Sequence, residues 1–435
     1  MKSDLSVHSE ILEDDECQHG SCILRDEPVH CQKIENPSFS MRSKYPKIFL
    51  KPGREASLLR GHPWLFSGAV LSVEGCPEPG DVVVAATHKR ESLALGFYNP
   101  RCDIVFRLLT TNMDETLDES FWLRKIRTAM ELRGKVIPQD TNADRLVNAE
   151  GDGMPGLIVD QYGPYLVFSI ATAGIEKNRG VVLDSLLREI NPEGIYERSE
   201  GRARKIEGLE DRIGCVLGNF PETTEIIENG LHFRVDMLTG QKTGFFLDQR
   251  PNRQLLEKLC NGATVLNGFS YTGAFSVYCA RGGAKRVISV ESSEPANEMA
   301  RWNLQKNGFS ADQCPVVRAD IFTFLRETDE YFDIMILDPP AFAKAKKDVA
   351  KAASAYKDIN LQAVRRIREG GFLATFSCSN YIDEDLFGKI VAGAVRDAGK
   401  TARLLQTLGP GPDHLTNLAH PEGRYLKGLL IHIST

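Results

Sequence analysis

The stretch from Val265 to Ala280 reads VLNGFSYTGAFSVYCA and decides the fold of the C-terminal part of the chain. It starts with an apolar β-like run, continues with a small and polar turn from Asn267 to Gly273, and ends in a run with helical periodicity. This order of strand, turn and helix is typical of nucleotide-binding units in α/β sheets. Glu291 ends the next apolar run, where a carboxylate can accept hydrogen bonds from two ribose hydroxyls. The stretch therefore predicts an adenosine cofactor.

The composition of the turn narrows the kind of cofactor. A dinucleotide-binding turn follows Gly-x-Gly-x-x-Gly, in which the second Gly lets the backbone approach a pyrophosphate. Ser270 stands at that position here, so the turn favours a cofactor without phosphates. S-adenosylmethionine (SAM) meets this requirement, because it needs a ribose acceptor, a slot for adenine and backbone near its methionine group. Taken alone, the turn is weak evidence for a cofactor and fits an ordinary connection between a strand and a helix somewhat better.

The chain after Met237 alternates regularly between short apolar runs and helix-like stretches. Such alternation predicts a doubly wound, Rossmann-like α/β sheet, in which ligands bind at the carboxyl ends of the strands. The expected strands are residues 264–267, 287–291, 316–319, 333–338, 372–378, 403–408 and 426–433.

Three polar residues are expected at this edge of the sheet. Asp320 follows the third strand, where its carboxylate can accept a hydrogen bond from the exocyclic amine of adenine. Asp338 precedes two prolines, which fix the backbone and remove two N–H donors. Cys378 ends the next strand. A lone Cys after an apolar run is usually a core residue, but its position here makes it a candidate nucleophile.

A thiolate that adds to carbon 6 of a pyrimidine makes carbon 5 able to attack a methyl sulfonium. A free thiol with a pKa of ~8.5 is only a few per cent ionised at pH 7, so the site must lower that pKa or remove the proton on binding. Asp338 can hydrogen-bond the ring nitrogen and the amine of cytosine as charge develops there.

Composition divides the chain into four regions. Residues 1–44 are polar and acidic and lack periodicity, so we expect a disordered extension. Short β-like runs and turns in residues 45–112 predict a small β domain, and residues 115–235 mix helical and β-like patterns, which predicts an α+β middle domain. The α/β sheet occupies residues 236–435.

The bulk composition indicates a globular protein outside the membrane. No apolar run approaches membrane-spanning length, and the N-terminus lacks the pattern of a signal peptide, so we expect a cytoplasmic protein. The ten cysteines have no framework spacing, which predicts free thiols. No metal is expected, because the only candidate ligand group matches no standard zinc spacing. That group is Cys17, His19, Cys22, His30 and Cys31.

Positive charge is local rather than general. The net charge is −6, and residues 1–45 carry −4 of it through nine acidic and five basic residues, so a basic face elsewhere is compatible with the total. The segment RGHPWLFSGAV, from Arg60 to Val70, combines charge and aromatic groups that could bind RNA. Without further context, the favoured interpretation is that Trp64 and Phe66 are core residues. A basic run at 198–205 is either a second patch or a solvated loop. The candidate phosphate-binding residues are Arg60, His62, Arg198, Arg202, Arg204, Lys344, Lys346 and Lys347.

Together these residues resemble the class I SAM-dependent ribosomal RNA cytosine-C5 methyltransferases of the large-subunit methyltransferase I type, which carry an N-terminal PUA domain. The resemblance runs from residue 45 to the C-terminus. It is carried by stretches that occur in this order: RGHPWLFSGAV, EGDGMPGLIVD, TGQKTGFFLDQRPNR, LDPPAFAK, YKDINLQA, FSCS and HPEGRYLKG.

The resemblance implies a PUA-like RNA-binding domain at 45–112 and formation of 5-methylcytosine at an unpaired cytosine of large-subunit ribosomal RNA. It leaves a homodimer open. It implies Cys378 as nucleophile with Asp338 beside it. The implied cofactor-binding residues are Phe246, Gln249, Arg253, Asn267, Phe269, Ser270, Tyr271, Thr272, Gly273, Glu291, Asp320 and Asp338.

Two departures from the family pattern and two rival functions accompany this interpretation. Family members usually have an acid where Asn267 stands and often Lys where Ala341 stands. The missing acid at 267 is expected to weaken contact with the methionine ammonium of SAM. One rival is a SAM-dependent RNA methyltransferase acting on a base nitrogen such as that of guanine, which needs no Cys nucleophile. The other is a noncatalytic RNA-binding protein with a decayed methyltransferase fold, against which the retained acids and Cys378 argue.

Overall fold

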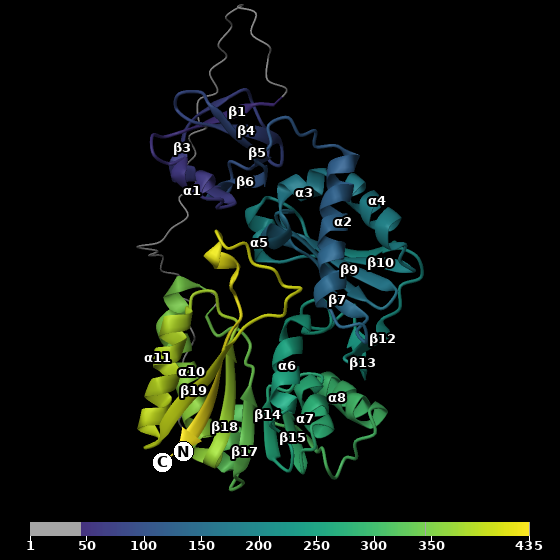
Figure 1. Cartoon of the computed structure of the whole chain (residues 1–435), viewed down its shortest axis with the longest axis vertical. Helices are drawn as coiled ribbons and strands as arrows, with labels where there is room; N and C mark the ends of the chain where they lie inside the picture. Colours follow the sequence, from purple (N-terminus) through teal and green to yellow (C-terminus); the bar gives the residue numbers. More distant parts are fainter. Residues whose placement is uncertain (1–44, 344, 435) are drawn as a thin grey trace, which may run out of the picture.

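The computed structural model describes residues 45–343 and 345–434, which form a small β domain, a middle domain and a large α/β domain (Figure 1). This architecture confirms the fold class predicted from the sequence. The candidate zinc ligands at 17–31 and Lys344 lie outside the described residues. Among the described residues, every helix is too short or too polar to span a bilayer.

The β domain is a six-stranded sheet in the order β2-β6-β5-β4-β1-β3. Its alternating apolar residues form a core that includes Ile48, Val83 and Phe106. The expected single run from Trp64 to Val73 is broken by the 3-10 turn η1, and Phe66 is 47% exposed, so the core assignment of Phe66 is wrong. The elements are β1 (Lys47–Leu50), α1 (Ala56–Leu59), β2 (Trp64–Phe66), η1 (Ser67–Ala69), β3 (Val70–Glu74), β4 (Val82–Ala86), β5 (Ser92–Tyr98) and β6 (Ile104–Thr110).

Within residues 45–434, the cysteines follow the predicted free state except at Cys76. Cys102, Cys215, Cys260, Cys279, Cys314 and Cys378 are free thiols. Cys76 is disulfide-bonded, so the expectation is wrong there. Pairing depends on which side chains the fold brings together, and sequence spacing alone does not reveal it.

The middle domain is a five-stranded sheet in the order β11-β10-β9-β8-β7, packed against α2 and α4. The β domain docks on it, because Phe97 stacks on Trp122 with ring centroids 6.2 Å apart. Gly174 permits this contact, since a Cβ there would lie 2.0 Å from the Phe97 ring. The elements are α2 (Glu119–Val136), β7 (Ala143–Asn148), η2 (Ala149–Asp152), β8 (Leu157–Tyr162), β9 (Tyr165–Ile170), α3 (Ala173–Lys177), α4 (Arg179–Ile190), β10 (Gly194–Ser199), α5 (Arg202–Ile206) and β11 (Arg212–Leu217).

A two-stranded hairpin connects the middle domain to the large domain. It consists of β12 (Thr223–Glu228) and β13 (Leu231–Asp236), which pair antiparallel. Phe233 on β13 belongs to one continuous buried cluster with Tyr162 of the middle domain and Tyr278 of the large domain. The two domains therefore share a core across this hairpin.

The large domain is a seven-stranded sheet in the order β16-β15-β14-β17-β18-β20-β19, with helices on both faces (Figure 1). All seven expected strands are present, and the last, β20, pairs antiparallel with both neighbours. Strand order reverses between β14 and β17, which is where such sheets bind ligands. The strands are β14 (Thr264–Gly268), β15 (Arg286–Glu291), β16 (Val316–Arg318), β17 (Phe332–Leu337), β18 (Ile367–Ser377), β19 (Thr401–Leu408) and β20 (Lys427–Ser434).

The helices of the large domain cover the sheet as a doubly wound fold requires. Those on one face are α6, α7 and α8, and those on the other are α9, α10 and α11. Their bounds are η3 (Leu247–Gln249), α6 (Arg250–Glu257), α7 (Ala274–Arg281), α8 (Glu294–Lys306), α9 (Ile321–Glu327), η4 (Lys346–Asp348), α10 (Val349–Arg366), α11 (Glu384–Asp397) and η5 (Pro421–Gly423).

The connection between β19 and β20, residues 409–426, is called the strap here. Figure 1 shows it in yellow, rising from the large sheet towards the other two domains. Its His420 packs against Trp64 of the β domain with ring centroids 4.2 Å apart. Its Asp413 accepts hydrogen bonds from Arg250 of α6, through Oδ2 at 2.9 Å, and from Arg133 of α2, through its carbonyl at 2.7 Å. The strap thus joins all three domains.

Candidate active site

Asp338 and Cys378 follow adjacent parallel strands at the carboxyl edge of the large sheet. Leu337 of β17 pairs with Thr375 of β18, and the two chains then leave the sheet side by side. The Sγ atom of Cys378 lies 3.9 Å from the carbonyl oxygen of Pro339, the residue after Asp338. The sheet order thus brings together the two residues that the sequence singled out as catalytic.

Asp338 is held by a short chain of amide side chains. Gln249 donates from Nε2 to Asp338 Oδ2 at 2.9 Å, and Asn252 donates to Gln249 Oε1 at 2.6 Å. Burial, together with the nearby Asp248 carboxylate, raises the pKa of Asp338 to about 7, against the opposing effects of Lys242 and the Gln249 hydrogen bond. Asp338 therefore exists in both its neutral and its ionised form near neutral pH.

A charge cluster around the buried Asp248, which the sequence interpretation missed, lies beside this carboxyl group. Asp248 accepts hydrogen bonds from Lys242 Nζ at 2.6 Å and from the Tyr425 hydroxyl at 2.5 Å. Burial alone would favour neutral Asp248, but the Lys242 ammonium and the other partners hold its pKa well below its ordinary value. Lys242 also lies over the Phe246 ring, 4.5 Å from its centroid. A signal was available, since these residues fall in the stretches 239–253 and 420–428 that carry the family resemblance.

Cys378 is in an environment that favours the neutral thiol. Burial raises its pKa, and the Asp338 carboxylate raises it further, while Lys242 acts in the opposite direction. Of the two alternatives that the sequence left open, a lowered thiol pKa or removal of the proton on binding, the raised pKa favours the second. Lys427, also missed, is buried nearby and donates from Nζ to the carbonyl oxygen of Ser379 at 2.8 Å.

The turn after β14 is strongly curved and has an unused polar atom. Phe269, Tyr271 and Gly273 all have positive φ, at 58°, 47° and 74°. The turn is closed by the Gly273 amide, which donates to the carbonyl oxygen of Ser270 at 2.8 Å. The Ser270 hydroxyl oxygen is buried and has no hydrogen-bond partner among the described residues. A buried polar atom of this kind normally has a partner, so this position fits a ligand such as SAM.

Two carboxylates flank the turn with part of their hydrogen-bonding capacity in use. Glu291 accepts from the Tyr271 amide at 3.1 Å and from the Ser293 amide at 2.9 Å, which fixes its side chain beside the turn. Asp320 caps α9 by accepting from the Thr323 amide at 2.9 Å through Oδ1. An ionised carboxylate has about four acceptor positions, so both groups retain capacity for ribose or adenine donors.

An aromatic group lines the same region. The rings of Phe269, Phe322 and Phe342 have centroids 6.2 to 6.4 Å apart. Such a group provides apolar faces on which an adenine ring can stack. Phe322 was not singled out from the sequence, although it stands only two residues after Asp320. Phe246, which the sequence analysis did single out, lies edge-on to Tyr271 with ring centroids 5.3 Å apart.

Three predicted cofactor residues are buried and bonded to other groups of the protein. Arg253 is 1% exposed and pairs with Glu228, with Nε to Oε1 at 2.8 Å and Nη2 to Oε2 at 2.7 Å. Its Nη1 donates to the Phe246 carbonyl at 3.0 Å, so Arg253 fixes the backbone of the segment that carries Phe246. Asn267 is buried and donates to the Ser276 hydroxyl at 2.9 Å. Thr272 is buried as well, and its carbonyl accepts from Asn303 at 2.8 Å.

Some candidate phosphate-binding residues are exposed, and others already contact groups of the protein. Arg60, Arg202, Lys346 and Lys347 are exposed. Arg204 is buried and pairs with Glu176 at 2.8 Å, so its assignment as a surface contact is wrong, and the run from Arg202 to Lys205 lies in helix α5 rather than in a loop. Arg198 donates to the Gly240 carbonyl at 2.7 Å, and His62 contacts Glu422 of the strap at 3.4 Å. Local sequence does not reveal which cations find a partner through folding.

Comparisons with family models and solved structures agree with this geometry. Residues 209–393 match the model for S-adenosylmethionine-dependent methyltransferases, and residues 48–111 match the model for the PUA-like domain. A solved structure from Streptococcus mutans, described as a candidate SAM-dependent methyltransferase, superposes with a TM-score of 0.75 at 24% identity and covers 89% of this chain and 99% of its own. A candidate methyltransferase solved in complex with SAH gives a TM-score of 0.77 at 24% identity, with the same coverage. At this identity the two structures support the fold alone.

Curated relatives match over nearly their whole length. Ribosomal RNA large subunit methyltransferase I from Aeromonas salmonicida is 44% identical over 390 residues, which are 88% of this chain and 98% of the relative. The protein of the same name from Photobacterium profundum is 41% identical over 396 residues, 89% and 99% of the two chains.

The fold, the turn after β14 and these matches define an enzyme that uses SAM as a methyl donor and carries a PUA-like domain at its N-terminal side. Within that class, the chain belongs to the ribosomal RNA large subunit methyltransferase I family.

Proposed function

We propose that this enzyme methylates carbon 5 of an unpaired cytosine in large-subunit ribosomal RNA, with Cys378 as the nucleophile. The observation that carries the proposal is the adjacency of Cys378 and Asp338 at the ends of β18 and β17, with the thiol sulfur 3.9 Å from the Pro339 carbonyl. Methylation of a guanine nitrogen needs no thiol beside the carboxylate. The relatives' name supports large-subunit ribosomal RNA as the substrate.

The reaction begins when the Cys378 thiol loses its proton to solvent and the resulting thiolate attacks the ring. A bond forms between Sγ and carbon 6, the electron pair of the 5,6 double bond moves towards carbon 4, and ring nitrogen 3 gains a proton from neutral Asp338. Carbon 5 is then nucleophilic. Bound SAM supplies an electrophilic methyl group, whose bonding electron pair stays on the departing sulfur. Loss of the carbon 5 proton to solvent and of the Cys378 thiolate then restores the double bond, and nitrogen 3 returns its proton to Asp338.

The protein supports this step through the protonation of two groups. The pKa of Asp338 is raised to about 7, so a large fraction of the molecules can donate a proton at neutral pH. Gln249 fixes the orientation of that carboxyl group. The Cys378 thiol has a raised pKa, which keeps it protonated until substrates bind. A cation near the thiol, as a sulfonium would be, favours the thiolate.

The rest of the chain supports capture of the RNA. The β domain and the middle domain face the strap, and exposed Arg60 and Arg202 belong to these two domains. A single unpaired cytosine reaches the recessed thiol without the cost of extracting a base from a duplex, which is a few kcal/mol. We therefore infer that the accessory domains bind RNA backbone around one exposed cytosine.

The test is to locate the methyl group. Ribosomal RNA from a strain lacking the protein is incubated with SAM and either the wild-type enzyme or Cys378→Ser, and then analysed by bisulfite sequencing. We expect one protected cytosine with the wild-type enzyme and none with Cys378→Ser, because a neutral hydroxyl is a much weaker nucleophile than a thiolate.

The matched control is Cys215→Ser, which alters an exposed free thiol in the middle domain and should retain activity. Calorimetry should give similar SAM affinities for all three proteins. Methylation of a guanine nitrogen, or full activity of Cys378→Ser, contradicts the proposal.

A further inference from the structure

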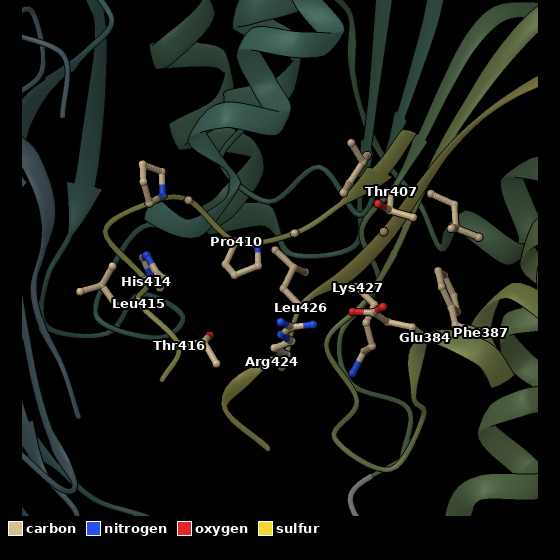
Figure 2. A pocket seen from close by; sticks show the side chains of 16 residues that line it. Glu384, Phe387, Thr407, Pro410, His414, Leu415, Thr416, Arg424, Leu426 and Lys427 are labelled. Carbon is tan, nitrogen blue, oxygen red and sulfur yellow. The ribbon is translucent and has the colours of Figure 1, made fainter. Parts of the chain in front are cut away.

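A cavity of about 440 Å³ adjoins the candidate active site (Figure 2). It lies between the N-terminal turn of α11, the ends of β19 and β20 that face the carboxyl edge, and the strap. Its volume falls within the range of roughly 300 to 1,000 Å³ that is usual for ligand sites. Among its lining side chains are Glu384, Thr407, His414, Thr416, Arg424 and Lys427.

The cavity lies next to the candidate active site but shares none of its reacting residues. Its lining contains neither Cys378 nor Asp338 and no residue of the turn after β14. Lys427 belongs to both places, because it lines the cavity while its Nζ donates to the carbonyl of Ser379, the residue after Cys378. A group that fills this cavity therefore lies next to whatever base reacts at Cys378.

One cation of the cavity is available to a ligand. His414 contacts the Asp413 carboxylate at 3.1 Å, and Lys427 is committed to Ser379. The exposed Arg424 guanidinium has no hydrogen bond or ion pair with any residue of the described ranges. Guanidinium groups bind phosphate oxygens in a two-pronged geometry, so Arg424 is suited to a phosphodiester.

The part of the cavity wall formed by residues 409–412 is fixed to the segment that positions Asp338. Asn252 donates to the Gly409 carbonyl at 3.0 Å, and the Gly411 amide donates to the Asp248 carbonyl at 2.8 Å. Pro410 and Pro412 alternate with these glycines and restrict the backbone further. A wall of this kind loses little conformational entropy when a ligand binds.

We propose that this cavity receives the nucleotide adjacent to the target cytosine and that Arg424 binds the phosphate of that nucleotide. The inference rests on the proposed function, since it needs an RNA strand whose target base lies at Cys378. Glu384, a carboxylate in the same lining, sets a limit on phosphate binding through repulsion. Arg424 thus acts on RNA affinity and placement and not on the chemical step.

The experiment compares Arg424→Gln, Glu384→Gln and Arg365→Gln with the wild-type enzyme in methyl transfer to ribosomal RNA that lacks the modification. Arg365 is a matched control, because it is exposed at the end of α10, next to the start of β18 and so at the opposite edge of the sheet. The KM for RNA is measured at several salt concentrations, and the rate at saturating RNA and the modified position are recorded.

For Arg424→Gln we expect the KM for RNA to rise ~10-fold or more, as for loss of a hydrogen bond to a charged group. The slope of log affinity against log salt should fall by about 0.7, which corresponds to one phosphate contact on a single strand. Glu384→Gln should change the KM in the opposite direction, and Arg365→Gln should leave both quantities unchanged. The rate at saturating RNA should stay within a factor of about two, because Arg424 contacts no reacting atom.

Three results overturn the inference: an unchanged KM and salt slope in Arg424→Gln, an equal effect of Arg365→Gln, or a loss confined to the saturated rate. All three leave the proposed function intact if the wild-type enzyme forms 5-methylcytosine. If it forms another product, the proposed function fails, and the position of the methyl group shows this independently of Arg424.

Discussion

Replacing Asp338 by Asn tests whether this residue donates a proton during the reaction. The substitution preserves the size of the side chain and its contact with Gln249, whose Nε2 lies 2.9 Å from Oδ2, but it removes the titrating group. With a pKa of about 7, Asp338 is ~90% neutral at pH 6 and ~10% neutral at pH 8. Because proton transfer by a positioned group contributes about 10² to 10⁴ in rate, we expect Asp338→Asn to lose that factor at pH 7.

The shape of the pH profile is more specific than the loss in rate. The wild-type reaction needs neutral Asp338 and ionised Cys378, and the pKa of the thiol lies above its ordinary value. Below pH 7, Asp338 is neutral and the rate rises tenfold per pH unit with the thiolate fraction. Above pH 7, the falling fraction of neutral Asp338 cancels that rise, so the profile bends to a plateau. The amide introduced by Asp338→Asn does not titrate, so the rate of this variant should continue to rise through pH 7 without a bend.

The assay is single-turnover transfer of a radiolabelled methyl group from SAM to RNA between pH 5.5 and 9, with both substrates saturating. SAM affinity measured by calorimetry at each pH serves as the control for binding. If the bend near pH 7 persists in Asp338→Asn, the titrating group is a different one and the assigned role of Asp338 is wrong.

Two further predictions concern cofactor affinity and stability. Glu291→Ala removes a charged hydrogen-bond acceptor beside the turn after β14, and hydrogen bonds to charged groups are worth ~1.5 to 3 kcal/mol, so calorimetry should show SAM binding weakened by roughly ten- to hundredfold. Cys378→Ala should bind SAM normally. Equal SAM affinities of Glu291→Ala and the wild-type enzyme would remove Glu291 from the site. Arg253→Met leaves the buried Glu228 carboxylate without its closest cation and should lower the free energy of unfolding by about 3 to 5 kcal/mol in urea titrations. Unchanged stability would show that this pair is not structural.

The large domain shows which structural features local sequence patterns can predict. The stretch from Val265 to Ala280 forms a strand, a curved turn and a helix as predicted, because turn residues and hydrophobic periodicity act over a few residues. The alternation after Met237 likewise predicted all seven strands and the edge at which Asp338 and Cys378 meet. Parallel strands separated by helices have few possible arrangements, so local patterns were sufficient for this level.

By itself, then, the sequence determined the fold class, the cofactor and the pair of residues at the carboxyl edge of the sheet. Only the tertiary structure decided which charges are paired: Arg253 with Glu228, Arg204 with Glu176, and Lys242 with Asp248 beside Asp338. It also decided the raised pKa values at Asp338 and Cys378, and the course of the strap across three domains. Pairing and burial depend on groups far apart in the chain, and the free energy of a charged side chain changes by several kcal/mol according to whether it is buried with a partner or exposed to water.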